Sequence, residues 1–348
     1  MKRCWVCGMG VAIVLALLCF GSAAVVAETL VLGTWGGAYE TLFKEEIIPL
    51  FEAEFNCTVI VDVGSSTARI AKIAAQVNDQ QIDVAMETAE ALLAGIQQGV
   101  LEPLDPTLIP NLADVDPKFR DPFTKEDGVY GSAVSWTAAG ILWRPDLVPF
   151  EITSWKDLWH RALEGKIALQ QWPNVGAISD LIFSAHTYGG DQHNIEPGFE
   201  AYKALMPNVH HFFEISSQAP AEVMSGEVWV TVTIAGRGIP YLDEGLRITI
   251  PEEGTTYSLQ GICIGKNTKH YDLACKFVNF MLSPEIQQIW SCGLHYPPSN
   301  PLTELDDECQ SQMVETPEVM ESLWYMDFEY ISQMKEEWTE RFNREVNK

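Results

Sequence analysis

The sequence predicts an α/β protein with two domains, and three observations carry that prediction. The chain has 348 residues, which at roughly 150 residues per domain corresponds to about two domains. β-rich runs alternate with amphipathic helical patterns through residues 29–98, and this alternation is typical of a parallel sheet covered by helices on both faces. A similar pattern returns from residue 261 onward, after a middle region with strands and helices of its own.

The first part of the chain contains three expected strands, each followed by an expected helix. The strands are expected at 29–32, 58–63 and 82–86, and the helices after Gly37, at 65–76 and at 88–98. Ligands of such sheets bind beyond the carboxyl ends of the strands. The turns after Gly33, Val63 and Met86 are therefore expected to face a ligand.

The middle region begins with a Pro- and Asp-rich stretch, 101–125, that is expected to be a connecting loop. Ser154 and Asp157 form a capping-box pattern at the start of an expected helix over 155–162. Further strands are expected at 129–142, 166–170, 228–234 and 247–250, and further helices at 177–185, 199–206 and 219–225.

The last part of the chain is expected to be mostly helical. It contains a strand at 261–264, a helix at 270–282 and a loop at 296–301. Ser283 followed by Pro284 marks the start of another helix, because Ser caps helices and Pro suits their first position. Apolar residues recur at intervals of three and four over 319–342, which predicts one long amphipathic helix that packs on a domain.

Residues 1–27 have the organisation of a secretory signal peptide. Lys2 and Arg3 form a basic start, and an apolar run follows at 11–20. This run is too short for a transmembrane helix, which needs about 20 residues. Small residues come next, and cleavage is expected near Ala24 or Ala27. The mature protein is therefore expected to be exported.

The chain is strongly acidic. It has 22 Lys and Arg against 48 Asp and Glu, a net charge of −26, which becomes −28 when Lys2 and Arg3 leave with the signal peptide. Nucleic-acid binding depends on basic residues that neutralise phosphates, so we expect no nucleic-acid partner. The charge fits either simple solubility or attraction of cationic solutes, and net charge alone does not separate the two.

Five cysteines remain in the expected mature chain, and export permits disulfides. They are Cys57, Cys263, Cys275, Cys292 and Cys309. Because five is odd, at least one thiol has no partner within the chain. Cys292 and Cys309 flank a Pro-rich loop and are the first candidates for a bridge. The alternative, that all five are small buried hydrophobic residues, stays open.

Motifs of common enzymes are missing from the sequence. It contains neither His-Glu-x-x-His nor Gly-x-Ser-x-Gly, and the glycines before Lys266 have the wrong spacing for a phosphate loop. His210 and His211 are adjacent, so in a strand they would point to opposite faces and not share a metal. We therefore expect no catalytic residues, no metal and no cofactor.

Residues 30–40, with the sequence LVLGTWGGAYE, resemble the opening of periplasmic solute-binding proteins of ABC importers. The resemblance is to the spermidine/putrescine-binding branch and its opine and amino-acid relatives. Shorter matches follow in the same order at 82–84, 99–104, 129–131, 153–158, 251–254 and 274–281. They extend the resemblance over nearly the whole mature chain.

The resemblance implies a two-lobe periplasmic-binding-protein fold (Venus flytrap, type II) with a ligand cleft between the lobes. Lobe 1 is expected at 28–133 with 256–300, lobe 2 at 134–255, and a C-terminal helical segment at 301–348. The implied function is periplasmic capture of a small organic solute and its delivery to an ABC permease in the inner membrane. The protein is expected to be a monomer.

Twelve residues are expected to line the cleft. They are Trp35, Gly36, Gly37, Tyr39, Glu87, Thr88, Trp136, Trp172, Asn174, Arg237, Tyr257 and Gln260. Trp35 falls where the family places an aromatic wall, and the glycines after it let backbone N–H groups approach a ligand. Trp136 lies on the first expected crossing strand, where it fits either the core of the hinge or the wall of the cleft.

The sequence departs from the polyamine-binding pattern at several of these positions. A polyamine site needs carboxylates at the ammonium ends, but Trp172 and Asn174 stand where that branch has acids, and Gln260 stands at another such place. Arg237 replaces a small polar residue, and a cleft arginine prefers a carboxylate or phosphonate. The family thus implies a polyamine, whereas these residues favour an amino acid, an opine or an aminophosphonate.

Two other functions stay open. One is a secreted enzyme on the same fold that uses Glu87 or a histidine. The other is an accessory protein that binds a solute and presents it to a chemoreceptor.

Overall fold

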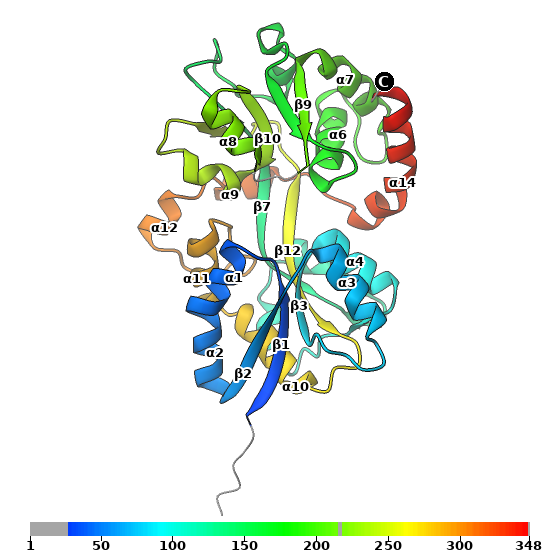
Figure 1. Cartoon of the computed structure of the whole chain (residues 1–348), viewed down its shortest axis with the longest axis vertical. Coiled ribbons are helices and arrows are strands. Elements are labelled where there is room, and N and C mark those ends of the chain that lie inside the picture. The colour runs from blue at the N-terminus through cyan, green and yellow to red at the C-terminus, as the bar shows by residue number, and fades with distance from the viewer. Residues whose placement is uncertain (1–26, 215–217, 347–348) are drawn as a thin grey trace, which may run out of the picture.

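The computed structural model describes residues 27–214 and 218–346, so the expected signal peptide lies outside the described residues apart from Ala27. Strands and helices form two lobes, one above the other in Figure 1. The strands are β1 (Glu28–Thr34), β2 (Cys57–Val63), β3 (Val84–Thr88), β4 (Leu101–Glu102), β5 (Thr124–Lys125), β6 (Gly128–Val129), β7 (Ser132–Trp143), β8 (Ile167–Gln170), β9 (Val209–Phe213), β10 (Val230–Ile234), β11 (Arg247–Thr249) and β12 (Tyr257–Gly265). The α-helices are α1 (Ala38–Leu42), α2 (Ile48–Phe55), α3 (Ser66–Ala75), α4 (Ala89–Gln97), α5 (Pro117–Arg120), α6 (Val175–Thr187), α7 (Glu196–Leu205), α8 (Gln218–Ser225), α9 (Ala235–Gly238), α10 (Tyr271–Met281), α11 (Pro284–Leu294), α12 (Asp307–Ser311), α13 (Pro317–Ser322) and α14 (Phe328–Glu345).

Lobe 1, the lower lobe of Figure 1, is built on β1, β2 and β3. β1 pairs in parallel with both neighbours, and β12 adds an antiparallel strand beside β3. Helices α1, α2 and α11 lie on one side of these strands and α3 and α4 on the other (Figure 1). The alternating strand and helix pattern of residues 29–98 therefore predicted this lobe correctly. A π-helical turn, Phe43–Ile47, joins α1 to α2.

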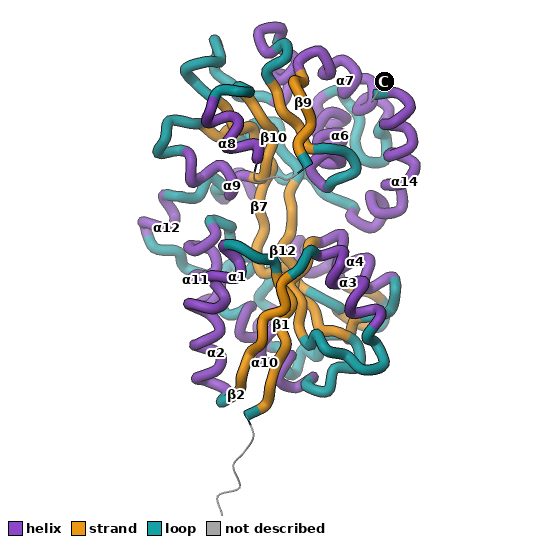
Figure 2. Tube along the Cα trace, viewed as in Figure 1, coloured by secondary structure: helices purple, strands orange, loops and turns teal. Residues whose placement is uncertain are grey.

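Lobe 2, the upper lobe, is built on β8, β9 and β10, which also pair in parallel. The helix pair α6 and α7 packs on one side of this sheet, and α8 lies on the other (Figure 2). The capping box of Ser154 and Asp157 is confirmed, but the segment behind it forms two 3-10 helices, at Trp155–Trp159 and Arg161–Leu163, instead of one α-helix.

Strands β7 and β12 connect the two lobes into one sheet, whose order in the described residues is β2-β1-β3-β12-β7-β10-β8-β9. The first half of β7 pairs with β12 up to Ala138, and its second half pairs with β10 from Ala139. All twelve residues of β7 are buried. Because both lobes share these strands, a bend here would move one lobe against the other.

The C-terminal segment differs from its prediction. The prediction of one long helix over 319–342 is wrong, because this stretch forms two helices, α13 and α14, with a non-helical segment between them. Leu323 is extended and forms a bridge to Thr255, and Asp327 then caps α14 by accepting from the N–H of Tyr330 at 3.0 Å. α14 packs on lobe 2 through Phe342 and also contacts α4 of lobe 1.

The disulfide expected between Cys292 and Cys309 is confirmed, and it ties α11 to α12. Cys57, Cys263 and Cys275 are buried free thiols. In the described parts of the chain, no helix combines the length and apolarity that crossing a bilayer requires.

Candidate ligand site between the lobes

A buried arginine holds together the strand ends that face lobe 2. Arg69 of α3 donates from Nη1 to the carbonyl oxygens of Thr34 at 2.7 Å and Gly64 at 3.0 Å, which end β1 and follow β2. Its Nε donates to Oε1 of Glu87 in β3 at 2.8 Å, and both side chains are at most 1% exposed. Arg69 therefore fixes the carboxyl ends of three strands, where the sequence predicted a ligand.

Glu87 is thus placed differently from its prediction. Its carboxylate is enclosed in lobe 1 and engaged by Arg69, so it does not reach the space between the lobes. Burial raises the pKa of Glu87 to about 7, against the opposing charge and hydrogen bonds of Arg69 and a hydrogen bond with Ser66. The sequence reasoning missed Arg69; its signal is a cation directly before Ile70 on the buried face of α3.

Trp35 lies in the turn after β1, as expected, and its position is set by two contacts. Its Nε1 donates to Oγ of Ser66 at 3.0 Å, and its ring lies 5.6 Å from the Arg69 guanidinium carbon. The side chain stays only half-buried. The same Ser66 oxygen accepts from the N–H of Thr88 at 3.4 Å, so two of the expected residues share one anchor.

The two glycines after Trp35 are exposed. Gly37 has φ of 71°, and a Cβ at this position would meet nothing within 4 Å, so its backbone conformation, and not crowding, requires glycine there. Gly36 and Gly37 thus lie exposed at the carboxyl end of β1, where the sequence predicted a ligand.

Two tyrosines from distant parts of lobe 1 meet beside Trp35. The rings of Trp35 and Tyr39 are 4.8 Å apart, and the Tyr39 hydroxyl donates to the hydroxyl of Tyr296 at 3.2 Å. Burial is the main cause that raises the pKa of both hydroxyls. Tyr296 follows α11 and was expected only as part of a loop, because nothing local in the sequence connects it with Tyr39, 257 positions away.

Lobe 2 approaches this pair through α9. A Cβ on Gly236 would lie 2.4 Å from Cε1 of Tyr296 and 2.9 Å from the carbonyl oxygen of His295, so only glycine allows the lobes to come this close. The next residue is Arg237, whose positive charge lowers the pKa of Tyr39 and of Tyr296 against the effect of burial. The expected residues Trp35, Tyr39 and Arg237 are therefore brought together, although they come from different lobes.

Arg237 is half-buried and incompletely satisfied. Its Nε is shielded from solvent and has no hydrogen-bond partner in the described structure. A buried N–H group without a partner is costly, and an arginine nitrogen is satisfied well by a carboxylate. An anionic group that entered between the lobes would satisfy this nitrogen.

Three other expected residues lie in the core around the crossing strands. Trp136, Tyr257 and Gln260 are 3%, 4% and 6% exposed. Trp136 stacks on Phe119 at 5.6 Å, and Oε1 of Gln260 accepts from Ser135 at 2.9 Å. For Trp136 the structure thus favours the core of the hinge over the wall of the cleft, and it encloses the other two as well.

The two expected residues after β8 have unequal surroundings. Trp172 is 5% exposed, because it stacks on Phe342 of α14 at 4.7 Å and donates from Nε1 to Oγ1 of Thr339 at 2.9 Å. Asn174 is the half-buried residue that precedes α6. Trp172 therefore supports the C-terminal helix α14, which was expected to pack on the lobes, and its ring is not exposed to a ligand as the prediction for Trp172 required.

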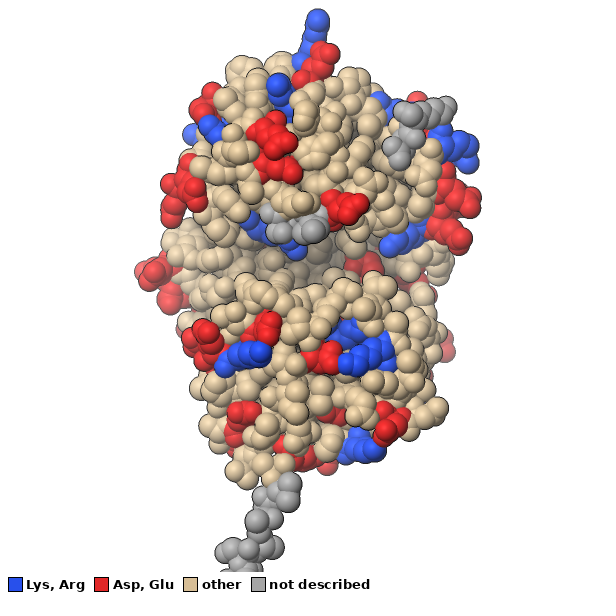
Figure 3. All heavy atoms as spheres, viewed as in Figure 1, with Lys and Arg blue, Asp and Glu red and all other residues tan. Residues whose placement is uncertain are grey.

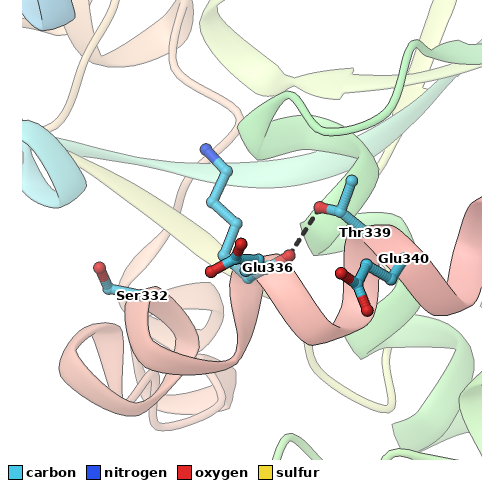
Figure 4. Close-up of a pocket in the computed structure, with 5 residues that line it drawn as sticks. Ser332, Glu336, Thr339 and Glu340 are labelled. Carbon is cyan, nitrogen blue, oxygen red and sulfur yellow. Dashed lines mark hydrogen bonds between the residues drawn. The ribbon is translucent and has the colours of Figure 1, made fainter.

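The molecule is hollowed between the lobes, and Lys and Arg atoms border the hollow on lobe 2 (Figure 3). An open groove of about 420 Å³ also runs along α14, lined by Ser332, Lys335, Glu336, Thr339 and Glu340 (Figure 4). Lys335 lies near lobe 1, since its charge lowers the pKa of Glu90, which burial raises. All lining residues come from one helix, so this groove lacks the opposing groups of the site around Arg237.

Among the described residues, no three His, Cys, Asp or Glu side chains gather closely enough to hold a metal ion. His210 and His211 lie on β9 with their rings at 83° to each other.

Comparison with known proteins agrees with this architecture. The family model for bacterial extracellular solute-binding proteins matches residues 46–317. The chain is 28% identical to an ABC transporter protein from Clostridium perfringens of known crystal structure, with a TM-score of 0.80 over 91% of this chain and 99% of that one. The two-lobe type II fold expected from the sequence is confirmed by this similarity.

Two curated relatives differ in how much of the chain they match. The chain is 27% identical to the spermidine/putrescine-binding periplasmic protein of Escherichia coli over 211 residues, which is 59% of each protein. The chain thus spans less than two thirds of the length of this relative. It is 24% identical to the gamma-aminobutyric acid-binding protein of Pseudomonas aeruginosa over 338 residues, 94% of this chain and 93% of that protein. By its fold and its match to the family model, the chain belongs to the bacterial extracellular solute-binding proteins.

Proposed function

We propose that the protein is an exported receptor that captures a zwitterionic amine, of the ω-amino acid type, between its lobes and delivers it to an ABC permease. Family membership supports the receptor role. The polyamine-binding and 4-aminobutyrate-binding relatives both take small organic amines, and the latter matches nearly the whole chain.

The observation that carries the choice of ligand is the unsatisfied Nε of Arg237 beside Tyr39 and Tyr296. A carboxylate placed there would accept hydrogen bonds from the guanidinium and gain from its charge. A polyamine would bring a second cation next to the first. Since like charges at short range repel, Arg237 favours a ligand with an anionic end over a dication.

The aromatic residues suit the remainder of such a ligand. The ring of Trp35 and the ring of Tyr39 are half-buried at the carboxyl end of β1, where they can cover a short methylene chain. A solute held by Trp35 in lobe 1 and Arg237 in lobe 2 makes all its contacts only when the lobes are together. It would therefore shift the protein toward the closed state that a permease distinguishes from the open one.

Isothermal titration calorimetry on Arg237→Ala tests this proposal. The purified mature protein is titrated with 4-aminobutyrate, butyrate and putrescine. Loss of a charged hydrogen bond should weaken binding of 4-aminobutyrate by about 10-fold or more. Arg247→Ala is the matched control. Arg247 is an exposed arginine of lobe 2 outside the site, and its guanidinium pairs with the carboxylate of Glu151 at a distance of 2.8 Å. A loss of less than about twofold in Arg237→Ala contradicts the role of Arg237.

Putrescine is the second candidate, and the net charge of −26 favours it. If putrescine binds and 4-aminobutyrate does not, the receptor role stands and the assignment of the ligand falls.

A further inference from the structure

We propose that Glu315, in the segment between α12 and α13, binds the amino group of the ligand. This inference rests on the proposed function, because it assigns the second end of the same zwitterion. No role was expected for Glu315, since it lies outside both expected lobes and outside every segment that carried the family resemblance.

Glu315 is anchored on the strand that connects the lobes. Its Oε1 accepts from Oγ1 of Thr137 at 2.8 Å and from the N–H of Ala138 at 3.2 Å. Both donors lie in β7, and Ala138 is the last residue of β7 that pairs with β12 before the strand enters lobe 2. A carboxylate is therefore held at the point between the lobes where a ligand is enclosed.

The second carboxylate oxygen has no partner. Glu315 is 8% exposed, and its Oε2 is shielded from solvent without a hydrogen bond in the described structure. Glu315 also takes part in none of the ion pairs found among the described residues. A buried carboxylate that lacks a cation is unfavourable, so the position suits a cationic group that arrives from outside.

Tyr296 connects Glu315 with Arg237. The negative charge of Glu315 raises the pKa of Tyr296 and the positive charge of Arg237 lowers it, so both charges lie near the same hydroxyl. The chain after Tyr296 runs along β7, where the N–H of Trp136 donates to the carbonyl of Pro297 at 3.1 Å, next to the Thr137 that anchors Glu315. An unsatisfied cation and an unsatisfied anion thus flank one pair of tyrosines.

The two charges do not pair with each other, and a molecule with separated opposite charges satisfies both. Its carboxylate would accept from Arg237, and its ammonium would donate to Oε2 of Glu315. The disulfide between Cys292 and Cys309 supports this arrangement, because it attaches the segment that carries Glu315 to α11, which ends just before Tyr296.

The geometry also predicts a proton release. Burial raises the pKa of Glu315 to about 7, against hydrogen bonds from Thr137 and backbone N–H groups. Near neutral pH, Glu315 is therefore protonated in a fraction of the ligand-free molecules. A bound ammonium favours the carboxylate, so binding should expel that proton, and a purely structural carboxyl group would not do so.

The test is calorimetry on Glu315→Gln, which keeps the size of the side chain and removes its charge. Loss of a charged contact should weaken 4-aminobutyrate binding by about 30-fold, with butyrate, which lacks the amine, changed less than about twofold. Titration at pH 6.5 in buffers of different ionisation enthalpy should show proton release in the wild type and little in the variant. Glu321→Gln, on the exposed face of α13, is the matched control.

The possible outcomes distinguish a Glu315 that binds the ligand from a Glu315 that only anchors the segment on β7. A Glu315→Gln protein that binds 4-aminobutyrate within about twofold of wild type, or loses 4-aminobutyrate and butyrate equally, shows a structural anchor and overturns the inference. If wild type binds putrescine and no zwitterion, the ligand proposal fails, and the same variant still tests Glu315 against putrescine. A wild type that binds neither amine overturns both proposals.

Discussion

Gly236 of lobe 2 lies directly against the ring of Tyr296 of lobe 1, so closely that a Cβ would stand 2.4 Å from Cε1. This contact joins the lobes at the residues that flank the ligand site. It also explains how Arg237, one position further along, comes to act on both Tyr39 and Tyr296. The structure leaves no room for a side chain at this position.

Gly236→Ala should therefore impair closure and not folding. The added methyl group cannot fit against Tyr296 unless the lobes separate, so we expect about 10-fold weaker ligand binding. Small-angle scattering should show a larger radius of gyration in the presence of ligand. Gly64→Ala is the control, because nothing lies within 4 Å of a Cβ there. Equal affinity of Gly236→Ala and wild type would show that this contact does not limit closure.

Arg69→Met should destabilise lobe 1. The substitution leaves Glu87 buried without its cation, and breaking a buried ion pair costs about 3–5 kcal/mol. Denaturant unfolding measures this loss. Adding Glu87→Gln to Arg69→Met should restore part of the stability, because the stranded charge is then removed. A double variant that is less stable than Arg69→Met would contradict the view that Glu87 exists as the partner of Arg69.

The pH dependence of stability should change in Glu315→Gln. Burial raises the pKa of Glu315 to about 7 from its usual value of 4.5, so folding favours its protonated form. The contribution of Glu315 to the stability of the folded protein is most favourable below pH 4.5, and it becomes less favourable as the pH rises from 4.5 to 7. The variant cannot lose this proton, so its stability should gain on wild type over that range, by on the order of 1–3 kcal/mol. Denaturation curves that differ by a constant amount at every pH would argue against the raised pKa.

The disulfide should matter for both stability and binding. Cys292 and Cys309 are 17 positions apart, and closing a loop of that length stabilises a protein by about 3 kcal/mol. Cys292→Ser with Cys309→Ser should therefore lower the melting temperature. It should also weaken 4-aminobutyrate binding, since the bridge holds the segment that carries Glu315. Thiol titration of the unfolded mature protein, which lacks the cysteines of the expected signal peptide, should find three reactive cysteines, namely Cys57, Cys263 and Cys275. Five would show that the bridge does not form.

Local sequence signals predicted much of this fold. The strands and helices of lobe 1, the caps at Ser154 and Ser283, and the disulfide depend on patterns within a few residues or on a single loop. The prediction of one long C-terminal helix was wrong, because the hydrophobic spacing continues across α13 and α14. The pairing of Leu323 with Thr255, which interrupts the helix, is a tertiary contact that this spacing does not reveal.

The candidate site was predictable only in part, for the same reason. Trp35 and Arg237 could be found because each follows a strand at its carboxyl end. Glu87 was assigned to the ligand because it lies at the end of a strand that faces the cleft, whereas its actual partner, Arg69, lies 18 positions earlier on another element. Tyr296 and Glu315 reach the site only through the return of the chain along β7, which no local pattern shows.

The deciding measurement is the affinity of the wild-type mature protein for 4-aminobutyrate, butyrate and putrescine, determined side by side by calorimetry at one ionic strength. Arg237 and Glu315 predict that 4-aminobutyrate, which has both charges, binds about 30-fold or more tightly than butyrate or putrescine, which each lack one of the required ends. Putrescine binding as tightly as 4-aminobutyrate, or more tightly, would contradict a site built for a zwitterion.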